Sequence, residues 1–213
     1  MAEPRSEPRS EPGPAADLPR AEATRARLLE AAVAAFAEKG FHGTTTRDIA
    51  TAAGMSPAAL YVHHRSKEEL LHLISRSGHE RTLALVQEGR ASSPDLVQQL
   101  RTVVRDFAVH HARGHTGARV VNYELAALSP EHHAEIAGLR RAIDAEVREL
   151  VREGVEAGVF RTPDARIAAA ALLSLGIDIA RWYREDVAWT PEELGDHYAD
   201  LAVRIVGAEP AGT

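Results

Sequence analysis

Hydrophobic residues recur every three to four positions along most of the chain, which is the spacing of helices with one buried face. In the first such segment, residues 20–39, an apolar face opposes arginines and glutamates. Few segments alternate as a strand does, and the β-branched clusters are short. The pattern predicts an all-α fold of about nine helices. Their expected spans are residues 20–39, 46–53, 57–64, 67–89, 94–113, 117–127, 130–157, 163–184 and 191–206.

The expected helix starts carry capping signals. Five of them place a serine or threonine directly before a proline, the order favoured at the N-cap and the first helical position. These pairs are Ser56-Pro57, Ser93-Pro94, Ser129-Pro130, Thr162-Pro163 and Thr190-Pro191. A glutamate stands three residues after Ser66 and after Thr190, which predicts a capping box at each. Gly40 is expected to end the first helix.

The composition is that of a folded protein of the cytoplasm. The chain has 213 residues, of which 45% are hydrophobic, enough for a buried core. It has no cysteine, which excludes disulfides, cysteine-bound zinc and thiol catalysis. No apolar run approaches the roughly 20 residues that span a bilayer, and the polar, proline-rich start is not a secretory signal. We therefore expect a cytoplasmic protein without a membrane partner.

Charge and composition divide the chain into three expected parts. Residues 1–17 repeat Glu-Pro-Arg-Ser without a large apolar side chain, which predicts a disordered tail. Residues 18–67 carry seven Lys or Arg and four acids, a balance of +3, whereas the whole chain carries −6. This asymmetry is typical of a small DNA-binding domain, here over residues 18–67, on an acidic body over residues 68–213, which is the expected ligand-sensing and dimerisation domain.

Residues 45–61 predict a helix-turn-helix. Two short helices meet at a tight turn, where Gly54 supplies the positive φ that such a turn needs. Ile49 and Leu60 are placed to pack beneath the crossing of the two helices. An αα-corner in any helical protein would share these features, so the flanking residues decide between the two interpretations.

The flanking residues resemble the TetR family of regulators over roughly residues 22–75. The matching motifs are Phe36-Ala37-Glu38-Lys39-Gly40-Phe41, Gly43-Thr44-Thr45, Arg47-Asp48-Ile49-Ala50, Ala53-Gly54, Leu60-Tyr61-Val62-His63-His64 and Lys67-Glu68-Glu69-Leu70-Leu71. Each motif alone is weak, but their order and spacing together are specific. The resemblance implies a transcriptional regulator that binds a palindromic double-stranded DNA operator as a homodimer and responds to a small molecule.

The resemblance also assigns the DNA contacts. Residues at or near phosphates are expected to be Thr45, Thr46, Tyr61, His63 and Lys67, whereas Arg47 can reach a phosphate or a base edge or remain solvated. The start of the third helix is expected to read bases, through Ser56, Pro57, Ala58 and Ala59. These side chains are short, so they can meet a thymine methyl or bond a base edge but cannot make the bidentate guanine contact of arginine. DNA shape must then contribute to specificity.

Residues 94–184 contain the expected ligand pocket. The candidates are Val103, Phe107, His110, His111, Asn122, Tyr123, Leu173, Ile177, Arg181 and Trp182. The polar members are the most informative, because burying them without a partner is costly. Any aliphatic member fits the core of a helical bundle equally well. His111 and His115 have the spacing of two metal ligands on a helix, but Gly114 interrupts that turn, so we expect no metal site and no cofactor.

The last two helices are expected to form the dimer. Small residues let helices approach closely, and two such helices from each chain can build a four-helix bundle across a two-fold axis. The candidates are Ala170, Gly176, Leu194, Tyr198, Leu201 and Ile205. The alternative is that these helices only close the core of their own chain.

Two further segments resemble the TetR regulators that respond to acyl-CoA thioesters: Ala180-Arg181-Trp182-Tyr183-Arg184 and Thr190-Pro191-Glu192-Glu193-Leu194. The resemblance implies a repressor released from its operator by an acyl-CoA of lipid catabolism. A drug- or antibiotic-responsive repressor of an efflux gene is the alternative regulator, and a helical adaptor without DNA binding is the alternative from another class. No nucleophile elbow, phosphate loop, dinucleotide fingerprint or zinc helix is present, so we expect no enzyme.

Overall fold

The computed structural model describes residues 14–208, with side chains from residue 21 onward. Over these residues the chain forms nine α-helices and one 3₁₀ turn, with no strand. The predicted all-α fold is confirmed. The elements are α1 (Pro14–Gly43), α2 (Thr46–Ala52), α3 (Pro57–His63), α4 (Lys67–Ala91), α5 (Leu96–Arg113), α6 (His115–Tyr123), η1 (Leu125–Ala127), α7 (Pro130–Glu156), α8 (Ala165–Trp182) and α9 (Pro191–Ile205).

The first helix starts earlier than predicted. Residues 14–17, expected in a disordered tail, belong to α1, because Pro14 suits the first helical position and alanines follow it. Residues 1–13 of the expected tail lie outside the described residues. Gly40 breaks the helix with φ of 69°, as expected, and the backbone then makes one more turn to Gly43. Gly54 likewise has φ of 69° in the turn between α2 and α3.

Three of the five hydroxyl–proline caps are confirmed. The side chains of Ser56, Ser129 and Thr190 each accept a hydrogen bond from a backbone N–H of the first turn. The caps predicted at Ser93 and Thr162 are wrong: Asp95 and Asp164 cap α5 and α8 instead. The proline after each hydroxyl lies just outside the helix, and an aspartate near the start of the apolar pattern competes as N-cap.

The two predicted capping boxes differ in completeness. At α9, Thr190 and Glu193 exchange both hydrogen bonds of the box. At α4, Ser66 accepts from the backbone of Glu69, but the carboxylate of Glu69 accepts from the N–H of Arg65. The carboxylate of Glu69 therefore still accepts from a backbone N–H at the start of α4. The donor is Arg65 rather than the N-cap residue Ser66 that a capping box would use.

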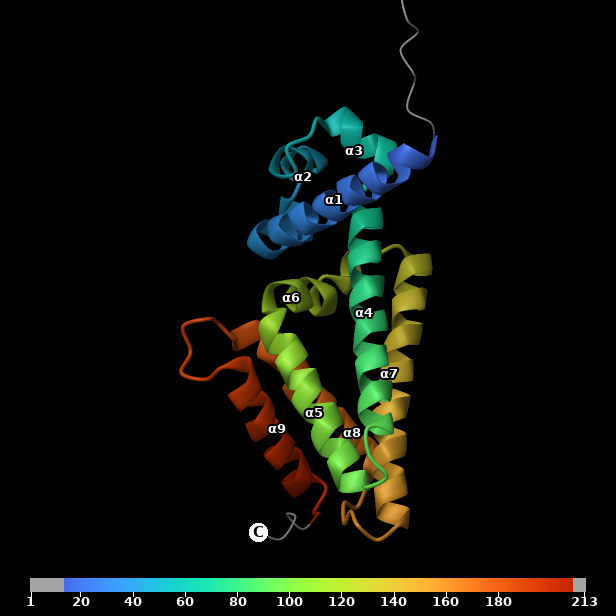
Figure 1. Ribbon diagram of the computed structural model, residues 1–213, viewed down its shortest axis with the longest axis vertical. Coiled ribbons are helices and arrows are strands. Elements are labelled where there is room, and N and C mark those ends of the chain that lie inside the picture. Colours follow the sequence, from blue (N-terminus) through green and yellow to red (C-terminus); the bar gives the residue numbers. More distant parts are fainter. Residues whose placement is uncertain (1–13, 209–213) are drawn as a thin grey trace, which may run out of the picture.

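The nine helices form a small head on a longer body (Figure 1). The head consists of α1, α2 and α3, and α4 runs from it down the length of the body beside α7. Helix α6 lies across the upper end of the body, beneath α1, and packs against both α1 and α4. Helices α5 and α8 complete the body, and α9 packs along the outer side of α5.

The core of the head continues into the body. Phe36, Ile49 and Leu60 are fully buried beneath the crossing of α2 and α3, as the sequence predicted. Val120 of α6 and Ile136 of α7 belong to the same apolar cluster. A rotation of the head therefore requires these body helices to repack.

In the body, two glycines let helices approach closely. A Cβ atom on Gly176 would lie 2.4 Å from the ring of Phe107, so α8 sits directly against α5 at this point. A Cβ atom on Gly195 would lie 2.6 Å from the side chain of Val109, which brings α9 onto the other side of α5. Any larger residue at either glycine would displace its helix.

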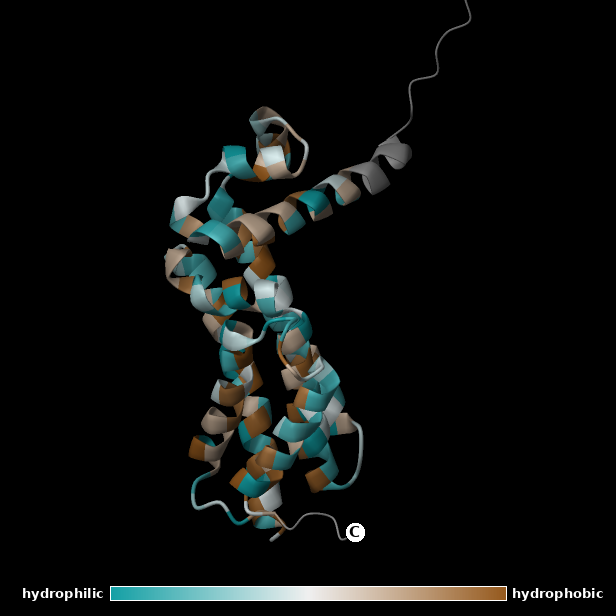
Figure 2. Cartoon of the chain, turned by 90° about the vertical axis from the view of Figure 1, so that its left-hand side faces the viewer, coloured by the Kyte–Doolittle hydropathy of each residue, from teal (hydrophilic) through white to brown (hydrophobic). Residues whose placement is uncertain are grey.

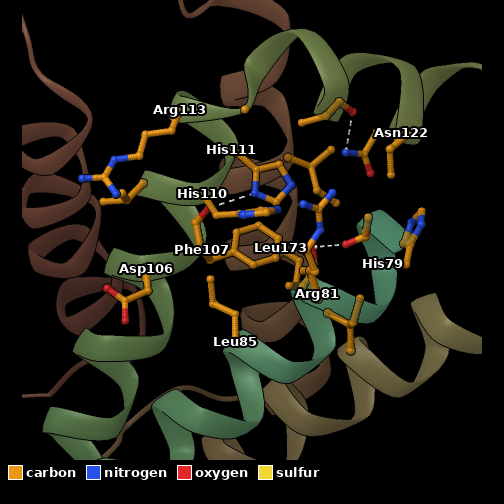
Figure 3. Close-up of a pocket in the computed structure, with 18 of the residues that line it drawn as sticks. His79, Arg81, Leu85, Asp106, Phe107, His110, His111, Arg113, Asn122 and Leu173 are labelled. Carbon is orange, nitrogen blue, oxygen red and sulfur yellow. Dashed lines mark hydrogen bonds between the residues drawn. The ribbon is translucent and has the colours of Figure 1, made fainter. Parts of the chain in front are cut away.

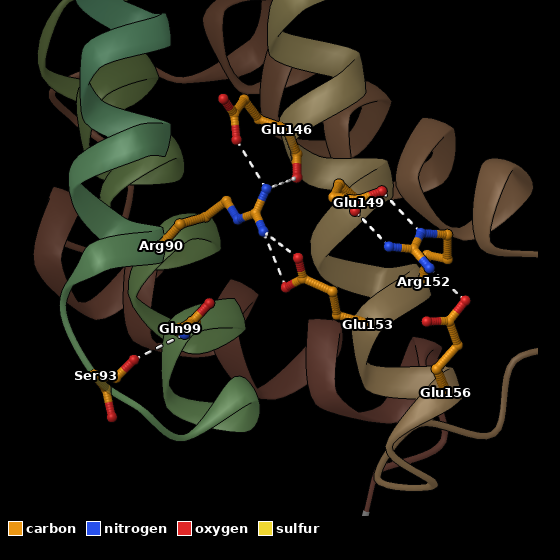
Figure 4. Close-up of polar contacts among 8 residues, drawn as sticks. All are labelled: Arg90, Ser93, Gln99, Glu146, Glu149, Arg152, Glu153 and Glu156. Carbon is orange, nitrogen blue, oxygen red and sulfur yellow. Dashed lines mark hydrogen bonds and ion pairs between the residues drawn. The ribbon is translucent and has the colours of Figure 1, made fainter.

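Ion pairs link the lower part of α4 to α7 (Figure 4). The guanidinium of Arg90 lies 2.8 Å from Glu146 and 2.8 Å from Glu153, and most of its side chain is covered. Arg152 pairs with Glu149 and Glu156 of its own helix, on the exposed side. Because Arg90 neutralises two carboxylates that face α4, it fixes the spacing of these helices below the head.

Hydrophobic residues concentrate on the facing sides of the long helices in the lower part of the molecule (Figure 2). Within the described residues, no helix is both long and apolar enough to cross a membrane.

Candidate functional site

The start of α2 is held by a capping box that the sequence did not reveal. Asp48 accepts hydrogen bonds from the backbone N–H and the hydroxyl of Thr45, and its own N–H donates to that hydroxyl. These bonds hold the pKa of Asp48 below its ordinary value. Thr45 is thus a structural cap here, and the following backbone N–H groups of α2 remain at the surface of the head.

The hydroxyls of Thr46 and Tyr61 lie 3.1 Å apart and form a hydrogen bond between α2 and α3. Tyr61 is 54% exposed, so its ring is a surface group rather than part of the core. The pair places two hydroxyls at one exposed point of the head. These hydroxyls can donate a hydrogen bond to a DNA phosphate without a movement of α2 or α3.

The start of α3 presents the short side chains expected to read bases. Ser56 uses its hydroxyl to accept from the N–H of Ala59, so in this arrangement it acts as a cap. Ala58 and Arg47 are exposed, and His63 is half-buried. The sequence analysis did not select Val62, which follows Ala58 by one helical turn and is 80% exposed. An apolar side chain left in solvent on this helix can contact a thymine methyl.

Lys67 points into the head. Its ammonium donates to the backbone oxygens of Phe41 and Thr44, at 2.8 Å each, and lies 4.3 Å from the centre of the Phe41 ring. These contacts join the start of α4 to the end of α1. One N–H of the ammonium remains for a phosphate, so the DNA contact expected at Lys67 stays a prediction.

A cavity of about 1430 Å³ lies between α4, α5, α7 and α8, beneath α6, and its lining extends to Ser92 at the lower end of α4. Six of the ten expected ligand residues line it: Phe107, His110, His111, Asn122, Leu173 and Ile177. Figure 3 shows the rings of Phe107, His110 and His111 close together on α5, while Asp106 and Arg113 of the same helix point the other way. Val33 of α1 also reaches the wall, so the cavity extends to the head.

Four expected ligand residues lie away from this cavity. Val103 is buried against Gly89, where α4 and α5 pack. Tyr123 and Arg181 border a separate small cavity of about 240 Å³ beside α1. Trp182 packs into an apolar cluster with Tyr183, at the end of α8. Arg181 is exposed and pairs with Asp178, so its contact with a ligand stays a prediction.

Three cavity arginines that the sequence analysis missed have no carboxylate partner among the described residues; Arg81 and Arg141 are exposed and Arg140 is half-buried. Arg81 of α4 donates only to the backbone oxygen of Ser77. Arg140 of α7 donates to the amide oxygen of Asn122, at 3.2 Å, and approaches Nε2 of His79 at 3.4 Å. Arg141 forms no hydrogen bond or ion pair with any described residue. All three line the cavity, where an anion could pair with them.

The other two arginines of the wall are already neutralised. Arg105 pairs with Asp106 and Asp196, and Arg113 pairs with Glu192. Both face the α9 side of α5. The unpaired positive charge of the cavity therefore belongs to α4 and α7. The wall also includes the exposed carboxylates of Glu88 and Glu185, which form no ion pair with a described residue.

Three of the histidines that line the cavity, His79, His110 and His111, are neutral at pH 7. Burial lowers the pKa of His111 from 6.5 to about 4, although its hydrogen bond to the backbone oxygen of Phe107 opposes this shift. Burial also lowers the pKa values of His79 and His110. These three histidines therefore add nothing to the positive charge that the guanidinium groups bring to the cavity. Within the described residues, no three His, Cys, Asp or Glu side chains are arranged to hold a metal ion.

Helix α6 connects the cavity to the head. Its inner face, including Gly117, Val121 and Asn122, lines the cavity. From its outer face, Arg119 donates a 2.7 Å hydrogen bond to the backbone oxygen of Ala37 in α1. A ligand that displaces α6 would therefore pull on α1 directly.

The expected dimer residues are divided between surface and interior. Gly176 and Leu194 are buried, Ala170 lines the cavity, and Tyr198 and Ile205 are half-buried against the body core. Leu201 is 43% exposed on the outer side of α9. Ile167 and Leu175 of α8, which the sequence analysis did not select, are also exposed apolar residues. A self-complementary contact would be centred on exposed apolar residues of this kind rather than on the glycine.

Comparison with known proteins gives matches to both parts of the chain. Residues 28–74 match the family described as "Bacterial regulatory proteins, tetR family". Residues 93–206 match the family described as "Tetracyclin repressor-like, C-terminal domain".

Individual relatives cover nearly the whole chain. The transcriptional repressor KstR2 of Mycobacterium tuberculosis is 29% identical over 192 residues, covering 88% of this chain and 94% of its own. A solved tetR-family regulatory protein from Rhodococcus RHA1 has 38% identity and a TM-score of 0.83, covering 88% of this chain and 98% of that one. AibR, solved with isovaleryl coenzyme A and operator DNA, shares the fold at a TM-score of 0.78 and 24% identity, covering 87% and 100%.

Proposed function

The chain belongs to the TetR family of bacterial transcriptional regulators, and from that premise we propose that it is a repressor released from its operator by an acyl-CoA thioester. It acts in the cytoplasm as a homodimer on a palindromic operator. The observation that carries the proposal is the cavity, in which an apolar wall meets three arginines without carboxylate partners.

The cavity suits a long ligand with an apolar end and an anionic end. Its volume of about 1430 Å³ exceeds the roughly 300–1,000 Å³ of a typical small-molecule pocket. Phe107, Leu173 and Ile177 offer the acyl chain an apolar slot between α5 and α8. Arg140 and Arg141 offer the CoA phosphates charge-assisted hydrogen bonds at the α7 wall.

The relatives support the same class of effector. KstR2 is named as a repressor. AibR binds isovaleryl coenzyme A and operator DNA in the same fold. In this chain we assign the CoA phosphates to the arginines of α4 and α7 rather than to Arg181 and Arg184 of the motif that resembles the acyl-CoA-responsive regulators.

The efflux-repressor alternative fits the cavity less well. A lipophilic cation would need covered carboxylates facing it. Asp106 and Glu192 are already paired with arginines, and the unpaired wall acids Glu88 and Glu185 are exposed to solvent. The adaptor alternative leaves the exposed Thr46–Tyr61 hydroxyl pair without a role. The relatives are regulators, and we propose no catalytic activity for this chain.

Calorimetry with three classes of ligand tests the proposal. Octanoyl-CoA and longer acyl-CoA thioesters are expected to bind, and octanoate is expected to bind at least tenfold more weakly, because it lacks the phosphates. The lipophilic cation rhodamine 6G is expected not to bind. Binding of rhodamine 6G without binding of any thioester would replace this proposal with the efflux one.

A further inference from the structure

His111 is a buried hydrogen-bonding group with one side unused. Only 3% of the residue is exposed, and its ring lines the cavity. Its Nδ1 lies 2.8 Å from the backbone oxygen of Phe107, one helical turn earlier. Its Nε2 has no hydrogen-bond partner among the described residues.

The partner of Nδ1 fixes the tautomer of this ring. A backbone oxygen can only accept a hydrogen bond, so Nδ1 carries the proton. The pKa of about 4 keeps the ring neutral at pH 7, and a neutral imidazole with a protonated Nδ1 has a lone pair on Nε2. His111 is therefore an acceptor within the cavity wall, and an apolar ligand would leave it unsatisfied.

The surroundings of His111 distinguish it from His79, the other fully buried histidine of the cavity. Nε2 of His79 already faces the guanidinium of Arg140, at 3.4 Å. The ring of His111 instead packs on Phe107, with 4.3 Å between ring centres. Phe107 in turn lies against Gly176 of α8. This is the apolar slot of the cavity, whose wall also includes the arginines of α7 that the proposed function assigns to the phosphates.

We infer that the effector carries a hydroxyl group on its acyl chain and that this hydroxyl donates a hydrogen bond to Nε2 of His111. The inference rests on the proposed function and narrows it from acyl-CoA thioesters to hydroxyacyl-CoA thioesters. A plain chain of the same length fits the slot but leaves the imidazole without a donor. His111 thus acts as the residue that selects the oxidation state of the acyl chain.

Matched thioesters test the inference on the wild-type protein. Octanoyl-CoA is compared by calorimetry with hydroxyoctanoyl-CoAs that carry the hydroxyl on carbon 3, 5 or 7. One hydroxylated isomer is expected to bind about fivefold to tenfold more tightly than octanoyl-CoA, as one hydrogen bond in a covered site allows. If no isomer binds more tightly than octanoyl-CoA, the inference is wrong.

The variant His111→Phe removes the acceptor and keeps an aromatic ring. It is expected to lose the preference for the hydroxylated isomer, so that octanoyl-CoA and hydroxyoctanoyl-CoA bind the variant with equal affinity. The control His133→Phe changes an exposed histidine of α7 outside the cavity and should keep the preference. Persistence of the preference in His111→Phe would overturn the assignment to this residue.

Two other outcomes are distinguishable from these. If His111→Phe weakened every thioester equally, the donor would be an amide of the CoA arm, and the inference would be wrong while the proposed function stood. If no thioester bound the wild type, the proposed function itself would fail, and the inference with it.

If His111→Phe does not fold, nitrogen NMR of the wild type decides the question. The unprotonated Nε2 resonance of His111 should shift on addition of the preferred hydroxyoctanoyl-CoA and stay in place with octanoyl-CoA. An equal response to both ligands would contradict the inference.

Discussion

Burial determines the protonation of His111, and this has a consequence for stability. Its pKa is about 4 in the folded chain, below the ordinary value of 6.5. Folding therefore favours the neutral ring, and the stability linked to it is complete above pH 6.5. It is lost as the pH falls from 6.5 towards 4, by up to about 3 kcal/mol for a shift of this size.

We predict that the midpoint of thermal unfolding falls over this pH range and that it falls less in His111→Phe. The variant has no group to protonate at this position, so the remaining fall comes from other groups whose pKa values are lowered in the folded chain, such as His79, His110 and Glu68. Circular dichroism melts at pH 7, 6, 5 and 4 measure the difference. Parallel curves for the two proteins would show that His111 does not titrate as described.

Arg140 is predicted to bind the anionic end of the effector. Replacing it by methionine keeps the length of the stem and removes the guanidinium, so affinity for octanoyl-CoA should fall about tenfold. Arg148→Met, on the same helix but outside the cavity lining, is the matched control. Calorimetry should show no change for the control. Equal affinities of Arg140→Met and wild type would remove the arginine from the ligand site.

Single residues differed in how well the sequence predicted them. His110, His111 and Asn122 could be selected because each is a polar residue on a predicted apolar face. Arg140 and Arg141 could not, since arginines on a long amphipathic helix usually mark its solvent side. These guanidinium groups line the cavity because of the way α4 and α7 pack around it, and the sequence pattern does not show that packing.

At the scale of elements, α6 is the part of the body best placed to move the head. It lies between the cavity and α1, and it also packs on α4, where a Cβ atom on Gly78 would lie 2.9 Å from Val121. A ligand beneath α6 can shift both helices only if it binds the shifted arrangement more tightly.

The hydrogen bond between Arg119 and the backbone of Ala37 is predicted to carry this coupling. Arg119→Ala should bind octanoyl-CoA and operator DNA within about twofold of the wild type, because it lies on the outer face of α6. The concentration of octanoyl-CoA needed to release the DNA should rise at least fivefold. Titration of both ligands separates the effects, and unchanged release in the variant would place the coupling elsewhere.

The elements themselves could largely be predicted from the sequence. The apolar spacing gave each of the nine helices to within a few residues, apart from the early start of α1 at Pro14. The predicted first residue of a helix was less reliable where two nearby residues can each serve as the N-cap, as Ser93 and Asp95 can at α5. The packing of the helices against one another was the hardest feature to predict, because the approach of two helices depends on residues from both. Helix α9, for example, lies mainly on α5 rather than on α8.

At the scale of the whole molecule, two heads must be held at a fixed separation. Regulators of this family bind their operators as dimers, with recognition helices in successive turns of the major groove. The distance between the heads then depends on the dimer contact and on the tilt of α4. A ligand can release the DNA by changing that distance without touching the DNA-binding surface.

We predict that Leu201→Glu produces monomers. Leu201 is 43% exposed on α9, and a carboxylate there would be buried without a partner in a dimer contact. Val155→Glu, at an exposed apolar residue of α7, is the control and should remain dimeric. Light scattering gives the mass of each. A dimer of Leu201→Glu would place the contact on another surface.

Release of operator DNA by an acyl-CoA thioester is the central claim, and fluorescence anisotropy tests it directly. The protein is first used to select its operator from random DNA, and the labelled operator complex is then titrated with octanoyl-CoA, hydroxyoctanoyl-CoA or octanoate. The thioesters should lower the anisotropy to that of free DNA, whereas octanoate should leave it unchanged at the same concentration. A thioester that binds the protein but leaves the operator bound, or equal release by octanoate, would contradict the account.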